Sequence, residues 1–136
     1  MNTRSIGRLA LAFVLALTAF MAFSLSAIAQ IDASQVFESG YVMLDTDLFV
    51  EFGAATRYSC DEIYVSSCKL QEMDSSGNVV SSKSLTAPST VVKGSTFTAF
   101  GDYGGKGTSG KRYRVQAVFY ADGATITRTS GTVTCK

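Results

Sequence analysis

Histidine is absent from all 136 residues of the sequence. Histidine is the common general base of enzymes, the usual partner of a nucleophilic serine or cysteine, and a preferred zinc ligand. A serine–lysine pair that uses Lys83 or Lys111 is still conceivable, but no motif positions such a pair. The sequence therefore predicts that the protein is not an enzyme and that it has no metal or other cofactor.

Charged residues are scarce near the N-terminus, where the sequence has the pattern of a secretory signal peptide. Arg4 and Arg8 precede an apolar run over residues 9–23, and Ala27 and Ala29 stand at the two positions that a signal peptidase reads. We expect a helical signal peptide over residues 1–29, which is cleaved on export.

Cleavage before Gln30 would leave residues 30–136 as one secreted domain of ordinary size. The alternative is an uncleaved membrane anchor, but a spanning helix needs about 20 apolar residues. Ser24 and Ser26 shorten the apolar run before it reaches that length. We therefore expect no membrane contact after cleavage.

The net charge of the chain is small, +1 from 12 basic and 11 acidic residues. Removal of Arg4 and Arg8 with the signal peptide changes the net charge to −1. A balance this close to neutrality gives no electrostatic reason to expect nucleic acid as a partner.

The three cysteines are few for an exported protein, and their number is odd. One internal disulfide would leave one thiol over, so the protein is predicted to be a monomer or a dimer linked through Cys135. A bridge between Cys60 and Cys68 is favoured and requires a turn at Asp61 and Glu62. A bridge between Cys68 and Cys135 is the alternative.

Good helical patterns are missing from residues 30–136, where serine, threonine, valine, glycine and aromatic residues dominate. The best strand covers residues 112–120, in which Tyr113, Val115, Ala117 and Phe119 alternate with polar side chains. An Asp-Gly hairpin turn over residues 121–124 follows. We expect the other strands at residues 35–44, 47–56, 63–73, 79–85, 96–100 and 125–135, and residues 91–92 follow a loop that contains Pro88.

This count of about seven short strands predicts an all-β sandwich. The glycine turn before Tyr113, two residues ahead of Val115, resembles the corner of fibronectin type III and immunoglobulin-like domains. The resemblance implies that the Tyr113 hydroxyl bonds to upstream backbone. Because the chain lacks tryptophan, it lacks the Cys-Trp-Cys pattern of antibody domains.

A second resemblance covers residues 61–135. The Asp-Glu-Ile sequence at 61–63, the turn near Gly77, the glycine-rich stretch at 100–105 and the aromatic residues of 113–121 resemble small exported proteins of Gram-positive gut bacteria. That group has no assigned biochemical role, so the resemblance implies export and a β-sandwich, and no activity.

Two motifs resemble ligand sites without completing them. Residues 105–112 approach a phosphate-binding loop, but Arg112 stands where the motif needs serine or threonine, and a strand follows instead of a helix. Asp45 and Asp47 could supply oxygen ligands for calcium, but the full ligand run of an EF-hand is missing. We expect neither a nucleotide nor a calcium site.

The candidate contact residues lie in the loop over residues 100–112 and on the strands beside it. Tyr103, flanked by Asp102 and by glycines, has the composition of an exposed binding loop. Basic side chains next to it could contact an anionic partner from one outer face. The predicted binding residues are Tyr103, Asp102, Lys106, Arg112, Arg114 and Arg128.

Together these features predict a secreted, non-enzymatic binding or structural module whose ligand is an extracellular protein or a glycan. The alternative is a secreted effector, similar to a bacteriocin or a toxin, that acts on another cell. In that alternative the odd cysteine would serve disulfide-linked assembly.

Overall fold

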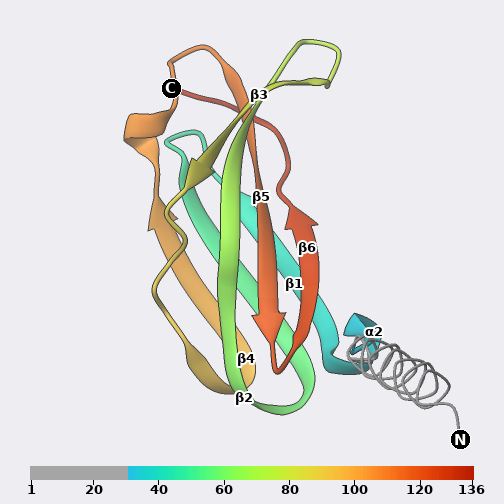
Figure 1. Cartoon of the computed structure of the whole chain (residues 1–136). Coiled ribbons are helices and arrows are strands. Elements are labelled where there is room, and N and C mark those ends of the chain that lie inside the picture. The colour runs from blue at the N-terminus through green and yellow to red at the C-terminus, as the bar shows by residue number, and fades with distance from the viewer. Residues whose placement is uncertain (1–30) are drawn as a thin grey trace, which may run out of the picture. The chain divides into compact units, whose positions relative to one another are not determined.

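The computed structural model describes residues 31–136, which form an all-β fold with one short helix at its start (Figure 1). The predicted signal peptide lies outside the described residues. None of the helices within residues 31–136 has the length and hydropathy that crossing a bilayer requires. The elements are α2 (Ala33–Val36), β1 (Phe37–Leu44), β2 (Phe49–Met73), β3 (Val79–Leu85), β4 (Val92–Asp102), the 3₁₀ turn η1 (Gly104–Lys106), β5 (Arg112–Ala121), β6 (Ala124–Thr129) and β7 (Val133–Thr134).

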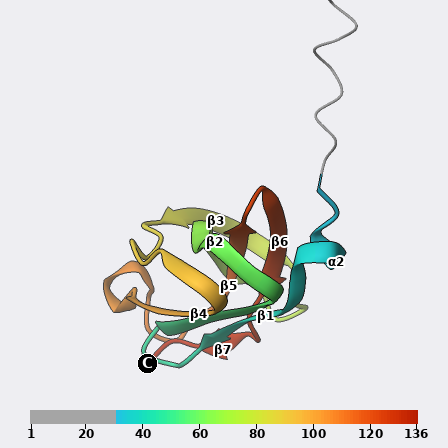
Figure 2. The ribbon, with the colours of Figure 1, turned by 90° about the horizontal axis from the view of Figure 1, so that it is seen from below.

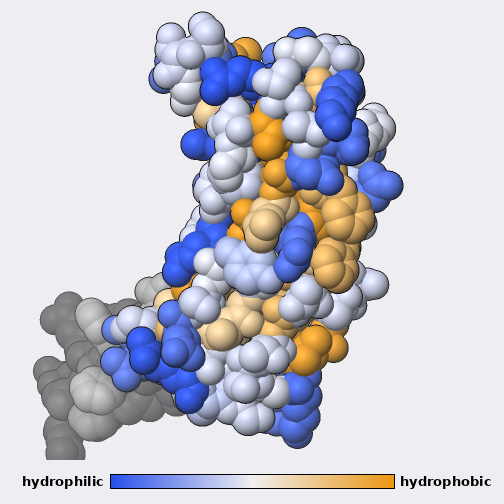
Figure 3. Space-filling model, turned by 180° about the vertical axis from the view of Figure 1, so that it is seen from behind, coloured by the Kyte–Doolittle hydropathy of each residue, from blue (hydrophilic) through white to orange (hydrophobic). Residues whose placement is uncertain are grey.

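The long strand β2 belongs to two layers. Its first part pairs with β1 on one side and β4 on the other, and its last part, from Ile63, pairs with β3 and β5. β5 also pairs with β6 and β7. The two layers face each other in Figure 2, an arrangement compatible with a β-sandwich, and the outer side of the β1, β2 and β4 layer faces the viewer in Figure 3.

Two strands expected at residues 47–56 and 63–73 are therefore one strand. The pairing of β2 with β4 shifts register between Ala55 and Cys60 and again between Cys60 and Ile63. Such irregularities bend a strand and increase its local twist. Here they let the chain pass from one layer to the other without a turn.

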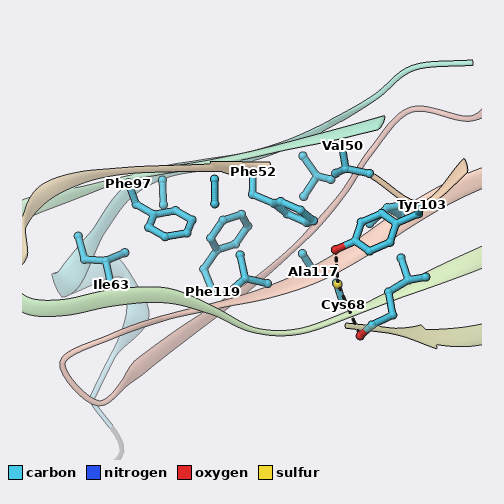
Figure 4. Close-up of a cluster of buried hydrophobic side chains, with 14 of the residues drawn as sticks. Val50, Phe52, Ile63, Cys68, Phe97, Tyr103, Ala117 and Phe119 are labelled. Carbon is cyan, nitrogen blue, oxygen red and sulfur yellow. Dashed lines mark hydrogen bonds between the residues drawn. The ribbon is translucent and has the colours of Figure 1, made fainter. Parts of the chain in front are cut away.

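The core lies between the layers and is built by alternation along the strands. Residues of β5 alternate strictly between half-exposed and buried, so Tyr113, Val115, Ala117 and Phe119 face inward as predicted. Phe119 meets Phe97 of β4 edge to face, with ring centroids 6.2 Å apart (Figure 4). Aromatic pairs favour this geometry, which fills the space between the layers.

The predicted hairpin turn between β5 and β6 is confirmed. Asp122 and Gly123 take φ angles of 43° and 90°, the positive values that such turns need. The Asp122 carboxylate also accepts hydrogen bonds from the backbone N–H groups of Asp61 and Glu62, at 3.0 and 3.1 Å. The turn is thereby fastened to the bend of β2.

The predicted bond of the Tyr113 hydroxyl to upstream backbone is also present. The N–H of Thr108 donates to Tyr113 Oη at 3.0 Å. Because Tyr113 is buried, this bond satisfies its hydroxyl and fixes the loop that leads into β5.

Strand boundaries differ from the prediction at both ends of the fold. The first expected strand begins with the single helical turn of α2, which Asp32 caps through the N–H of Ser34 at 2.9 Å. The last expected strand is broken into β6 and β7. At the break Ser130 bonds to Val115 through both its N–H and its hydroxyl, so the backbone of β5 stays paired there.

Candidate functional site

Tyr103, the predicted exposed anchor, is buried, with 8% of its surface accessible. Its hydroxyl donates to the carbonyl of Thr86 at 2.8 Å and lies 3.7 Å from the sulfur of Cys68 (Figure 4). Burial is the main cause that raises the pKa of Tyr103. The ring lies so close over Gly101 that a Cβ there would come within 2.5 Å of it. The expectation of an exposed contact is therefore wrong: the absence of a side chain at Gly101 lets the ring fold inward.

The neighbours of Tyr103 shape the same loop. Asp102 accepts a hydrogen bond from the N–H of Gly104 at 3.1 Å, which starts the turn of η1. The carbonyl of Lys106 accepts from Nζ of Lys83 at 3.3 Å, which links η1 to β3. Asp102 and Lys106 are both exposed, and the hydrogen bonds to the Asp102 side chain and the Lys106 carbonyl organise the loop.

The predicted basic strip is split between two faces. Arg112 donates to the carbonyls of Asp74 and Ser75, at 3.1 and 3.4 Å, and Arg114 donates to Gln71 at 2.7 Å. Arg128 stands opposite the buried Ala117 in the register of β5 and β6, so it points away from the face of Arg114. It donates to the carbonyl of Gly40 at 3.2 Å instead. The prediction that these arginines share one face is wrong because Arg128 falls on the inward position of β6.

The predicted disulfide between Cys60 and Cys68 is absent, and all three cysteines are free and buried. β2 runs on between Cys60 and Cys68 without the turn that the bridge requires, which separates them by roughly 25 Å of extended chain. Cys135, in the alternative pairing, packs near Gly107 at another part of the core. A disulfide needs Cα atoms closer than about 7 Å.

We expect no thiol of the folded protein to react with iodoacetamide, and three to react after unfolding in denaturant. Burial is the leading cause that raises the pKa of both Cys60 and Cys68, so little thiolate forms near neutral pH. Intact mass under both conditions measures the count. Uptake of one group after unfolding without reductant would reveal a disulfide, and a doubled mass would reveal a covalent dimer; either contradicts three buried free thiols.

Asp45 and Asp47 form a tight loop and show no calcium cage. One oxygen of Asp45, Oδ1, accepts from the N–H groups of Asp47 and Phe49, both at 2.9 Å. This arrangement supports the positive φ of 60° at Leu48. Among residues 31–136 no three acidic, cysteine or histidine side chains converge as metal ligands.

A surface that the sequence analysis did not single out lies on the outer side of β1, β2 and β4. Four large apolar side chains are exposed on it, with accessible fractions of 42% for Tyr41, 60% for Met43, 44% for Phe49 and 56% for Phe100. The strand register aligns Met43, Glu51 and Phe100 in one row across the layer. Figure 3 shows hydrophobic side chains gathered over this part of the molecule. We call Tyr41, Met43, Phe49, Glu51 and Phe100 the aromatic face.

Two pairs of side chains contact each other on the aromatic face. The rings of Phe49 and Phe100 stack with their centroids 5.8 Å apart. Tyr41 lies over Gly53, where a Cβ would come within 2.2 Å of its ring, and its hydroxyl donates to Glu51 at 2.6 Å. This bond is the main cause that raises the pKa of Tyr41. Four of the five side chains thus have a partner on the same face.

A shallow hollow of about 180 Å³ opens at one end of the aromatic face. It is lined by the exposed residues Met43 and Phe49, by the acidic residues Asp45 and Glu51, and by Leu44, whose side chain packs against the core. A cavity of this size accommodates one side chain of a ligand and is too small for a drug-sized molecule.

The outer side of the opposite layer is different in chemistry. Its outward positions are mainly polar, and Arg114 and Gln71 are already paired there. A stacked pair, Tyr64 and Tyr120, with centroids 4.8 Å apart, is the main aromatic feature. The two outer faces therefore differ in polarity. The aromatic face is the unusual one, because exposed protein surfaces rarely carry contiguous apolar side chains.

Comparison with protein-family models, with curated proteins and with solved structures found no match to this chain. One feature of the sequence indicates the aromatic face. Residues 48–52 place apolar side chains on both sides of one strand, with Phe49 on one side and Leu48, Val50 and Phe52 on the other. A strand with one solvated side alternates instead.

Proposed function

We propose that the protein is a secreted, non-enzymatic binding module that contacts a protein through the aromatic face. The observation that carries the proposal is the exposure of Tyr41, Met43, Phe49 and Phe100 on three adjacent strands. Apolar side chains that gather on one exposed surface commonly mark an interaction site. Aromatic residues and methionine are also enriched at the cores of protein interfaces.

A protein fits this face better than a glycan does. Sugar hydroxyls pair with donors as well as with acceptors, but the Tyr41 hydroxyl, the one side-chain donor among the five residues of the face, is already bonded to Glu51. Met43 and Phe100 offer apolar contact and no hydrogen bonding. Aromatic and methionine side chains instead suit the apolar residues of a protein partner.

Secretion is supported by the pattern of residues 1–29, with two arginines, an apolar run and the Ala-x-Ala sequence. Absence of enzymatic activity is supported by the lack of histidine and by the burial of the three thiols. The effector alternative relied on assembly through an odd cysteine, and the burial of Cys135 weighs against it.

An immunoglobulin-like or fibronectin type III-like fold is part of the same proposal. In immunoglobulin-type sandwiches the first, second and fifth strands share one layer, and the third, sixth and seventh strands share the other. When the two parts of β2 are counted separately, β1, the first part of β2 and β4 match the first set, and the rest of β2, β5 and β6 match the second. The fourth strand, β3, joins the second layer, which differs from the immunoglobulin constant type. The bond to the Tyr113 hydroxyl also supports it.

The proposal is tested by a photo-cross-linking amino acid placed at Phe100 in cells that produce the protein. Val80 of β3 is the matched control, since 61% of its surface is exposed against 56% for Phe100. We expect an adduct of one discrete mass from position 100 and none from position 80. An excess of unmodified protein should compete the adduct away, and an excess of the Met43→Ser variant should not. Equal adducts at both positions, or none at position 100, would refute the proposal.

A further inference from the structure

The aromatic face combines apolar side chains with negative charge. Glu51 lies in its central row, Asp102 stands opposite Phe49 in the register, and Asp45 borders the hollow. The outward positions of these three strands carry no lysine or arginine over residues 39–43, 49–55 and 96–102. Within these ranges the charged outward side chains are therefore all acidic, although the chain as a whole is nearly neutral. The nearest basic residues lie at the edges: Arg57 donates to the carbonyl of Ser34, and Lys136 bonds through its backbone N–H to Thr46.

The two carboxylates of the hollow each have an oxygen to spare. Glu51 receives the Tyr41 hydroxyl on Oε1, and Asp45 receives its two backbone N–H groups on Oδ1. Neither Glu51 Oε2 nor Asp45 Oδ2 accepts a hydrogen bond from residues 31–136, and neither carboxylate has an ion-pair partner there. Each is ready to accept a donor from a ligand.

We propose that the ligand of the aromatic face is a protein segment in which a lysine or arginine stands next to an apolar or aromatic residue, with the basic side chain in the hollow. This inference rests on the function proposed above. The hollow suits such a side chain because Met43 and Phe49 can contact its methylene stem while Glu51 and Asp45 accept from its charged end. The neighbouring apolar residue would cover the stacked rings of Phe49 and Phe100.

Charge also separates this ligand from two other occupants. A second copy of the chain would bring Glu51 and Asp102 toward an equally acidic face, and like charges across an interface oppose association. An anionic membrane surface would be repelled by the same groups. A basic protein segment is instead attracted by the carboxylates that repel a second copy of the chain and an anionic membrane.

The experiment is a selection of random short peptides, displayed on phage, against the immobilised secreted protein. We expect selected peptides to be enriched in lysine or arginine beside apolar residues and to lose binding to the Phe100→Ser variant. Glu51→Gln, which can still accept the Tyr41 hydroxyl, should weaken their binding about tenfold. Glu62→Gln removes the same charge at the exposed bend of β2 and should leave binding unchanged.

The outcomes separate the inference from the function on which it rests. Peptides that depend on Phe100 but lack basic residues would overturn the inference and leave the binding face intact. Equal weakening by Glu51→Gln and Glu62→Gln would overturn it as well, because the attraction would then be unspecific. Dimers that form on concentration and disappear in Phe100→Ser would assign the face to a second copy. The proposed function is tested separately, because the cross-linking experiment at position 100 uses no peptide. Absence of an adduct there would refute the function itself.

Discussion

Replacement of Phe119 by alanine is expected to lower the free energy of unfolding by about 3–5 kcal/mol. Phe119 is fully buried between the layers and packs against the ring of Phe97, which comes from the other layer. Alanine would remove that contact and leave a cavity that both layers enclose. A loss of this size is a large part of the roughly 5–15 kcal/mol that stabilises an ordinary domain.

Urea unfolding followed by circular dichroism measures this effect, and the tyrosines give a fluorescence signal in a chain without tryptophan. Phe100→Ala is the matched control, because the same side chain is removed at a position that is 56% exposed. The control should change stability by less than about 1 kcal/mol. If the two variants lost equal stability, the assignment of Phe119 to the core and Phe100 to the surface would be wrong.

Tyr103→Ala is expected to lower the free energy of unfolding by about 3–5 kcal/mol, since a buried ring is lost. Tyr103→Phe should lose about 1–3 kcal/mol, because it keeps the ring but leaves the carbonyl of Thr86 without its donor. Thermal and urea unfolding of the two variants measure the difference. The gap between them separates the contribution of the ring from that of the hydroxyl.

The same pair of variants decides between a structural and a binding role of Tyr103. Cross-linking from Phe100 should be unchanged in Tyr103→Phe, because Tyr103 faces the core. If Tyr103→Ala kept its stability but lost the cross-link from position 100, Tyr103 would be an exposed residue that contacts the ligand.

Much of the fold follows from local pattern. The alternation along β5 identifies its inward side chains, and the Asp-Gly pair identifies the turn at Asp122. These features depend on neighbouring residues, so a single sequence contains the information. The passage of β2 between layers does not follow in the same way, since the chain near Asp61 and Glu62 has the composition of a turn. There the carboxylate of Asp122, distant in sequence, bonds to the backbone and stabilises an extended path.

The candidate site was harder to predict because exposure depends on what packs above a residue. Tyr103 has the neighbours of a loop contact, yet the lack of a side chain at Gly101 lets its ring cover the core. Phe100 looks equally apolar in the sequence, but the register places it on the outer side beside Glu51. Arg128 was expected on the outward side of β6 but stands opposite the buried Ala117. Side chains alternate along a strand, so an error of one position in the register exchanges the two sides.

The continuity of β2 prevents the domain from being divided into two independent layers. One strand pairs with β1, β3, β4 and β5, so each layer contains part of the same 25-residue segment. A break at the bend of β2 would put β1 and the first part of β2 in one piece and β4 in the other, although these three strands pair in one layer. Neither layer can therefore be exchanged between proteins as a separate building block. The smallest unit that gene fusion or protein engineering can move intact is the whole described domain, residues 31–136.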